Sequence, residues 1–179
     1  METILLISSV LLWIILIFNL LTTFALVKKI NQLFSYPSKQ LDLLENGQIA
    51  PDFTVETLDG NKVRLNDYNE EIALVFVSPD CSPCKDEMPR LDILYPKARR
   101  AGVELSIVSL ADADSTRSYV EELEFKAPVL VAPRRQNSLS DHYKIPDTPS
   151  YYVIDKNRKI KSGGFLDDNW QMLTNSWES

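Results

Sequence analysis

The feature that most limits the fold is a continuous apolar run at residues 72–77, IALVFV, followed closely by a helical pattern at residues 85–100. An unbroken run rich in β-branched residues is typical of a strand that is buried on both faces of a sheet. Burial on both faces requires helices above and below that sheet. We therefore expect the soluble part of the chain to be an α/β domain.

The rest of the soluble part repeats this alternation. Asp59-Gly60, inside an alternating stretch, predicts a tight hairpin near the start of the domain. Further elements are expected as follows: strands at residues 103–110, 128–132 and 150–155, a return strand at 159–165, helices at 115–123 and 167–177 (the latter capped by Asp167 or Asp168), and a helical turn or two at 138–145. Together they predict a mixed sheet with helices on both faces.

Residues 4–27, ILLISSVLLWIILIFNLLTTFALV, contain no charged side chain. About 20 apolar residues cross the hydrocarbon core of a bilayer as a helix, so this run is long enough to span a membrane. A cleaved secretory signal would need a basic segment before a shorter apolar run, and neither is present. A buried soluble helix would need more apolar cover than the remaining sequence offers. We expect an anchor at residues 1–29, a linker at 30–46 with room for a short amphipathic helix at 41–44, and one domain at 47–179.

The formal net charge of −6 argues against nucleic acid as a partner, because phosphate binding needs a basic surface. The chain has one histidine, His142, which excludes most chemistry that depends on imidazole. It has two cysteines, Cys81 and Cys84, in the stretch VSPDCSPCK. Two are too few for a disulfide-stapled scaffold.

The spacing of these cysteines leaves three interpretations. A structural zinc site needs four ligands, and the chain offers too few histidines and cysteines for one. A disulfide that closes so short a loop removes little entropy from the unfolded chain, so a purely structural role is weak. A redox pair fits best, because Cys81 lies just after a buried strand and Cys84 lies inside the first turn of the following helix, where free amides and the helix dipole favour a thiolate. Lys85 adds a nearby positive charge, and Pro83 stiffens the loop. No metal and no cofactor are expected.

Four segments then identify a resemblance by their combination and order: GQIAPDF, LVFVSPDCSPCKDEMPRL, YKIPDTPSYYVID and KIKSGG. Over residues 47–165 the chain resembles the thioredoxin fold, and within it the membrane-anchored TlpA/ResA-like thiol–disulfide oxidoreductases and the related MauD-like (methylamine-utilisation) proteins. The resemblance implies a three-layer thioredoxin-like fold, preceded here by one transmembrane helix.

The resemblance also implies roles for particular residues. Cys81 matches the exposed nucleophile, and Cys84 matches the buried thiol that resolves the mixed disulfide. Pro89 matches the proline that kinks the active-site helix. Thr148-Pro149 matches the cis-proline dipeptide that packs beside the disulfide and pairs with the substrate polypeptide; a trans-proline in an ordinary loop is the alternative.

Glu87 matches the glutamate of a C-x-x-C-x-x-E pattern, which implies a carboxylate that moves protons during exchange; a solvated helix charge is the alternative. Two positions depart from thioredoxin itself. Val75 replaces its buried aspartate, and Asp80 replaces the tryptophan before the first cysteine. A carboxylate at that place opposes thiolate formation unless it faces solvent or pairs with Lys85. This variation favours the MauD-like branch.

The sequence therefore predicts a membrane-tethered oxidoreductase that exchanges its dithiol or disulfide with cysteines of exported client proteins, as a reductase or in disulfide maturation. A membrane electron donor such as a CcdA/DsbD-like protein is an expected partner. One alternative is a peroxiredoxin-like peroxidase using Cys81, although Leu74 stands where its motif has proline. The other is a non-catalytic anchored interaction module. Two indications of the membrane orientation disagree. Lys28 and Lys29 after the anchor favour a cytoplasmic domain, whereas the resemblance favours an extracytoplasmic one.

Overall fold

The computed structural model describes residues 1–34 and 43–177. The chain divides into two compact units, Met1–Leu41 and Asp42–Ser179. In the first, helix α1 runs over Glu2–Phe34. Its segment Leu6–Lys28, of 23 residues and mean hydropathy 2.6, is long and apolar enough to cross a membrane, and its side chains are exposed. The helix therefore continues into the first residues of the expected linker, and the expected domain boundaries stay predictions.

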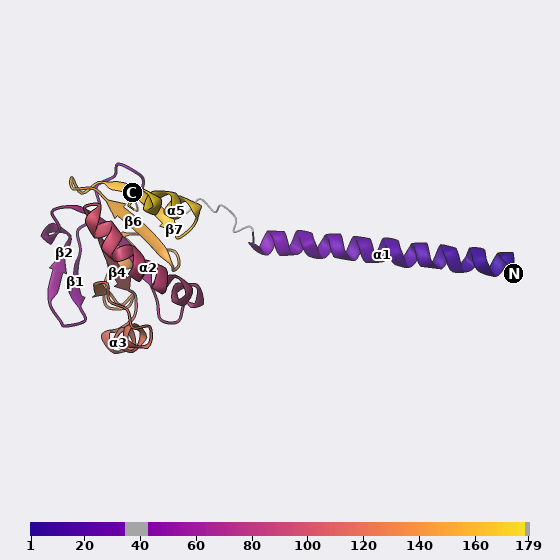
Figure 1. Cartoon of the computed structure of the whole chain (residues 1–179), viewed down its shortest axis with the longest axis horizontal. Coiled ribbons are helices and arrows are strands. Elements are labelled where there is room, and N and C mark those ends of the chain that lie inside the picture. Colours follow the sequence, from indigo (N-terminus) through magenta and orange to yellow (C-terminus); the bar gives the residue numbers. More distant parts are fainter. Residues whose placement is uncertain (35–42, 178–179) are drawn as a thin grey trace. The chain divides into compact units, whose positions relative to one another are not determined.

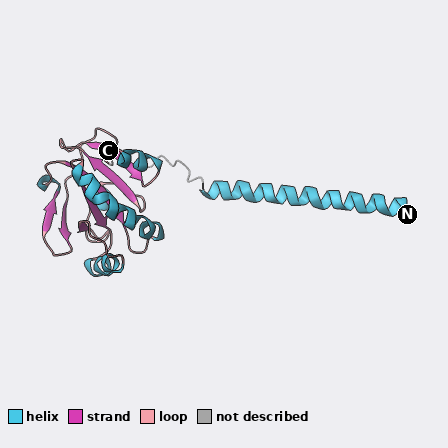
Figure 2. Ribbon diagram, in the orientation of Figure 1, coloured by secondary structure: helices cyan, strands magenta, loops and turns pink. Residues whose placement is uncertain are grey.

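The second unit is a seven-stranded sheet in the order β2-β1-β5-β4-β3-β6-β7, with helices on both faces (Figures 1 and 2). The core strands β3, β4 and β5 are parallel, and β6 lies antiparallel to β3 on its other side. Its elements are β1 (Thr54–Thr57), β2 (Lys62–Arg64), the 3-10 turn η1 (Leu65–Asp67), β3 (Glu71–Val77), α2 (Ser82–Arg100), β4 (Val103–Ser109), α3 (Ala113–Glu122), β5 (Val129–Val131), α4 (Leu139–His142), β6 (Ser150–Ile154), β7 (Ile160–Phe165) and α5 (Asp168–Asn175).

Alternation along each strand divides the interior into two cores. In β3, Val75 and Val77 face the core that α2, α3 and α5 cover, while Leu74 and Phe76 face the core that α4 covers. Every residue of β3 from Ile72 to Val77 is buried. This two-sided burial confirms the α/β prediction, because a strand at the centre of a three-layer fold has no face left for solvent.

The order of the strands makes the carboxyl end of β3 a distinct position in the sheet. From β3 the chain moves in one direction, to β4 and then β5, and β6 then returns to the opposite side of β3. The carboxyl end of β3 is therefore a point where the strand order reverses, and ligands of open α/β sheets bind at such points. Cys81 follows this end of β3, and Pro149 precedes the adjoining start of β6.

Most expected elements are confirmed, with small differences at their ends. The hairpin turns at Gly60, whose φ of +81° is in the left-handed region that glycine enters without strain. Helix α2 begins at Ser82 rather than at residue 85, because Cys81 is its N-cap. Helix α3 begins at Ala113, two residues early, because Asp112 caps it. The helix considered at residues 41–44 falls partly outside the described residues, and Leu43 and Leu44 are not helical.

Candidate active site

The site begins at the turn that links β3 to α2. The N–H of Cys81 donates to the carbonyl of Ser78 at 3.1 Å, which closes the turn. Cys81 is then the N-cap of α2, and its Sγ accepts a hydrogen bond from the N–H of Cys84 at 3.2 Å. Pro83 stands in the first turn of the helix, where the missing N–H costs no intrahelical bond. The local sequence thus directs a free helix amide at the first sulfur.

The two sulfurs have different surroundings although they are bonded to each other. Cys81 and Cys84 form a disulfide, with 5.2 Å between their Cα atoms. Cys81 is half-buried, whereas Cys84 is fully buried in the core under α2, with Val75 and Met88 among the residues of that core. An incoming thiol or disulfide can reach only the first sulfur. The second is available for an intramolecular attack, which is the division of roles that thiol–disulfide exchange needs.

A second segment meets the pair from the start of β6. The Thr148–Pro149 peptide bond is cis, as expected. The carbonyl oxygen of Thr148 lies 3.3 Å from Cys81 Sγ, a distance at which the reduced thiol can donate a hydrogen bond to it. Thr148 and Pro149 are both partly exposed. The structure thus brings together Cys81, Cys84 and the Thr148-Pro149 dipeptide, as the resemblance implied.

Glu87 lies one helical turn beyond Cys84, on the side of α2 that faces α5. Its Oε1 accepts a hydrogen bond from Arg90 Nη1 at 3.1 Å, and its side chain is 26% exposed. Sequence reasoning missed Arg90 as the partner, although the i,i+3 spacing of opposite charges could have indicated it. Whether Glu87 moves protons stays a prediction. Pro89 is exposed in the middle of α2, where the helix also contains Pro96.

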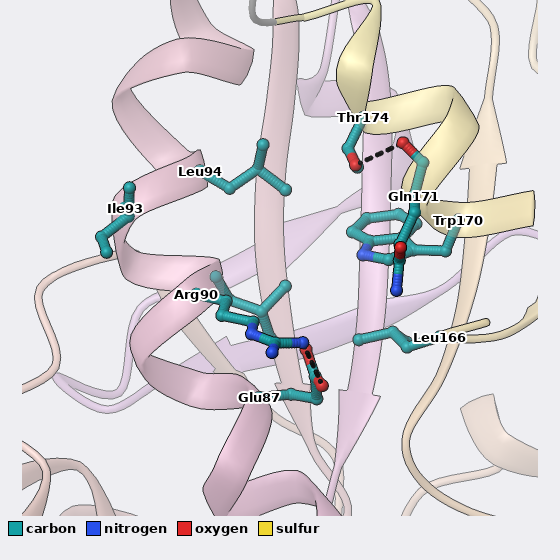
Figure 3. Close-up of a pocket in the computed structure, with 9 residues that line it drawn as sticks. Glu87, Arg90, Ile93, Leu94, Leu166, Trp170, Gln171 and Thr174 are labelled. Atoms are coloured by element: carbon teal, nitrogen blue, oxygen red, sulfur yellow. Dashed lines mark hydrogen bonds and ion pairs between the residues drawn. The ribbon is translucent and has the colours of Figure 1, made fainter. Parts of the chain in front are cut away.

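Glu87 and Arg90 also mark one end of a pocket between α2 and α5, with a volume of about 380 Å³ (Figure 3). Trp170 and Gln171 of α5 line its other side, together with Leu166, which precedes that helix. Neither cysteine lines this pocket. The sequence predicted a C-terminal helix at residues 167–177, but only the tertiary structure shows that it packs beside α2.

The charged residues nearest the pair do not form the contact that the sequence allowed. Asp80 is exposed to solvent. Lys85 instead pairs with Glu122 of α3, with 3.8 Å between Nζ and Oε1. Of the two arrangements expected to limit the effect of Asp80 on the thiol, the structure therefore has the solvent-facing one.

Ile93 is an apolar residue of α2 that faces solvent and is 63% exposed. Leu91 and Leu94, on the buried side, are 1% and 8% exposed. The spacing of the buried positions follows the helix period, and Ile93 lies outside it.

Comparisons with known proteins agree with this geometry. Residues 46–162 match the AhpC/TSA family. The thiol-disulfide oxidoreductase ResA of Bacillus cereus is 32% identical over 127 residues, which are 70% of this chain and 72% of that protein. A solved thiol:disulfide interchange protein from Bacteroides sp. has 25% identity and a TM-score of 0.66, covering 75% of this chain and 89% of that one. The thioredoxin domain of a Bacteroides vulgatus thiol-disulfide oxidoreductase has the same fold, with 23% identity and a TM-score of 0.67 over 76% of this chain and 99% of that one.

Proposed function

This chain belongs to the AhpC/TSA family and is a thiol–disulfide oxidoreductase, and on that premise we propose that it is a membrane-tethered reductase of disulfides in exported client proteins. The observation that carries the proposal is the pairing of a half-exposed Cys81 with a fully buried Cys84 beside the Thr148 carbonyl. A client backbone can lie along the cis-proline segment while its disulfide meets the first sulfur.

The exchange balances in two steps. The Cys81 thiolate attacks one sulfur of a client disulfide, so that a mixed disulfide forms and the other client sulfur leaves as a thiolate. The Cys84 thiolate then attacks Cys81 Sγ, which releases the second client thiolate and leaves the Cys81–Cys84 disulfide. The client has gained two electrons, and its two thiolates take up two protons, equal in number to those that the Cys81 and Cys84 thiols released on becoming thiolates. A membrane dithiol donor, of the CcdA/DsbD-like kind, returns the protein to its reduced form by the reverse exchange.

Several groups favour attack by Cys81. The N–H of Cys84 and the amino end of α2 stabilise negative charge on Cys81 Sγ, which lowers the cost of forming the thiolate. Glu87 is proposed as the carboxylate that accepts and returns the proton of the buried thiol, a role that suits a group one turn from Cys84. Thr148 and Pro149 are proposed to bind the client backbone, and Pro83 and Pro89 to shape the helix around the pair.

We propose that α1 anchors the protein and that the globular unit faces the extracytoplasmic side. The apolar segment Leu6–Lys28 supports the anchor. The resemblance to ResA-like proteins supports the orientation, and long domains are translocated despite a small charge bias such as Lys28 and Lys29. Disulfides persist on the extracytoplasmic side, so exported proteins there provide substrates for disulfide exchange.

The test uses the full chain in intact cells. A membrane-impermeant maleimide is applied before lysis, and the modification of Cys81 is read by mass spectrometry. A reductase that faces outward is expected to be labelled without prior reduction. The double variant Cys81→Ser/Cys84→Ser, which has no thiol, should take no label. Labelling only after permeabilisation would contradict the orientation. If Cys81 in intact cells takes the label only after reduction, the protein rests there with its Cys81–Cys84 disulfide formed, which would indicate an oxidant instead.

A second measurement distinguishes the peroxidase alternative. The reduced full chain in detergent micelles is mixed either with insulin or with hydrogen peroxide. We expect catalysed reduction of the insulin disulfides and no peroxide consumption beyond that of Cys81→Ser. Peroxide consumption that depends on Cys81, without insulin reduction, would overturn the proposal.

A further inference from the structure

Two carboxylates flank the point where the cysteine loop meets the cis-proline segment. Asp80 immediately precedes Cys81, and Asp147 immediately precedes Thr148; both side chains are exposed. The contact between Cys81 Sγ and the Thr148 carbonyl brings these loops together from positions 67 residues apart. Because consecutive Cα atoms are about 3.8 Å apart, covalent geometry keeps each carboxylate within roughly 10 Å of that contact.

Asp147 is also oriented. Its Oδ1 accepts a hydrogen bond from the N–H of Thr148 at 2.8 Å, which fixes the carboxylate to the segment that a client would follow. A carboxylate has two oxygens with several lone pairs, so one hydrogen bond from the backbone does not use all of its accepting capacity, and the side chain is exposed. The side chain can therefore still receive a cation from a bound partner.

Two of the cations near this end of the sheet are Lys85 and Arg134. Lys85 pairs with Glu122. Arg134 is exposed on the same edge of the sheet, but it follows β5, two strands away from β3 at about 4.8 Å per strand. Asp80 and Asp147 therefore place two negative charges beside the disulfide, at the adjoining ends of β3 and β6.

We propose that this protein selects client segments that carry lysine or arginine next to the reactive cysteine, and that Asp80 and Asp147 are the residues that select them. The inference rests on the proposed function and adds the substrate class of the same site. It also gives Asp80 a role: the carboxylate faces solvent, which limits its effect on the Cys81 thiolate, and from there it attracts a cationic segment to the sulfur.

The electrostatic argument sets the size and the salt dependence of the effect. The screening length in salt solution is about 30 Å at 0.01 M and about 3 Å at 1 M. Two charges within roughly 10 Å of the sulfur therefore act on a client residue at low salt and lose their effect at high salt. Complementary charge at such a site changes association rates more than the strength of the final complex.

The experiment measures the reduction of three peptides by the reduced full chain in micelles of a zwitterionic detergent. The peptides share one intramolecular disulfide and differ only in the residues flanking the attacked cysteine, which are lysine, alanine or glutamate. At 10 mM salt we expect the lysine peptide to react about tenfold faster than the glutamate peptide, and the ratio to fall toward one at 0.5 M. The Asp80→Asn/Asp147→Asn variant should abolish the ratio, since asparagine keeps the size and the hydrogen bond from Thr148.

Asp59→Asn is the matched control, an exposed carboxylate at the β1–β2 turn on the opposite edge of the sheet, and it should leave the ratio unchanged. A ratio that survives in the double variant would overturn the inference. So would an equal change in the rates of all three peptides, which would mean that Asp80 acts on the Cys81 thiol rather than on the client. If the unmodified chain reduces none of the peptides, the proposed function itself fails.

Discussion

The Sγ of Cys81 lies 3.3 Å from the carbonyl oxygen of Thr148, although the two residues are 67 positions apart in the chain. One residue belongs to the turn after β3 and the other to the loop before β6, and these strands are neighbours in the sheet. The exposed sulfur and the backbone that would bind a client are therefore parts of one site, held in place by strand pairing and not by loop contacts alone.

The first prediction concerns the order of the two thiols. Cys84→Ser should leave Cys81 able to attack a client disulfide but unable to resolve the product, so that a stable mixed disulfide accumulates. Cys81→Ser should form none, because the remaining thiol is fully buried. The measurement is non-reducing electrophoresis of the full chain after incubation with a disulfide client. A mixed disulfide that formed through Cys84 would contradict the assignment.

The second prediction concerns Glu87. Replacement by glutamine should slow exchange several-fold and change its pH profile if this carboxylate moves the proton of Cys84, while the free energy of unfolding changes by less than about 0.5 kcal/mol, since an exposed i,i+3 pair contributes little. Arg90→Gln is the control, because it removes the same ion pair and leaves the carboxylate. Equal kinetic effects in both variants would assign the pair a structural role only.

The third prediction tests the packing of β7 on β6. A Cβ on Gly163 would overlap the ring of Tyr152, which is fully buried and whose hydroxyl accepts a hydrogen bond from the N–H of Leu44 at 3.0 Å. Gly163→Ala should destabilise the globular unit by about 1–3 kcal/mol through overpacking. Gly164→Ala is the matched control, since its Cβ would lie 3.7 Å from the ring of Tyr151, an ordinary contact, and it should cost less than about 0.5 kcal/mol. Urea unfolding followed by tryptophan fluorescence compares the two.

The fourth prediction contrasts two buried tyrosines. The hydroxyl of Tyr143 donates to the carbonyl of Pro51 at 2.8 Å, so Tyr143→Phe should cost about 1–2 kcal/mol by leaving that acceptor unpaired. The hydroxyl of Tyr119 has no hydrogen-bond partner among the described residues, and burial raises its pKa to about 12. Tyr119→Phe should therefore be neutral or stabilising. A larger loss at Tyr119 than at Tyr143 would reverse this ranking.

The fifth prediction is a pH dependence at the start of α3. The N–H of Ser115, and then its hydroxyl, hold the pKa of Asp112 below its ordinary value by hydrogen-bonding the carboxylate. Because the folded-state pKa is lowered, this stabilisation is present above the unfolded pKa of about 3.9 and disappears as the pH falls through the folded value. Asp112→Asn keeps a capping side chain without the titration.

Urea unfolding of the natural chain and of the Asp112→Asn variant over a series of pH values provides the measurement. The stability advantage of the natural chain over Asp112→Asn should be constant above about pH 5 and should shrink below about pH 4. A difference that stays constant down to pH 2.5 would show that the charge of Asp112 does not contribute.

Much of the fold follows from local patterns. The two-sided burial of β3, the turn at Gly60 and the cap at Asp167 are each decided by a few adjacent residues, and the structure has all three. The cysteine pair could also be placed from the sequence, because a strand, a proline-containing turn and a helix follow one another without interruption. The exact start of α2 could not, because it depends on whether Cys81 serves as the cap.

The sequence by itself determined the residue types of the site: two thiols at a helix start, a carboxylate one turn later and a threonine–proline pair before the last hairpin. Only the tertiary structure decided which of them meet. Strand order places Thr148 against Cys81, packing of α5 on α2 closes a pocket at Glu87, and Lys85 pairs with Glu122 rather than with Asp80. The physical reason is that these contacts join segments far apart in the chain, and no local preference encodes the sheet pairing and helix packing that bring them together.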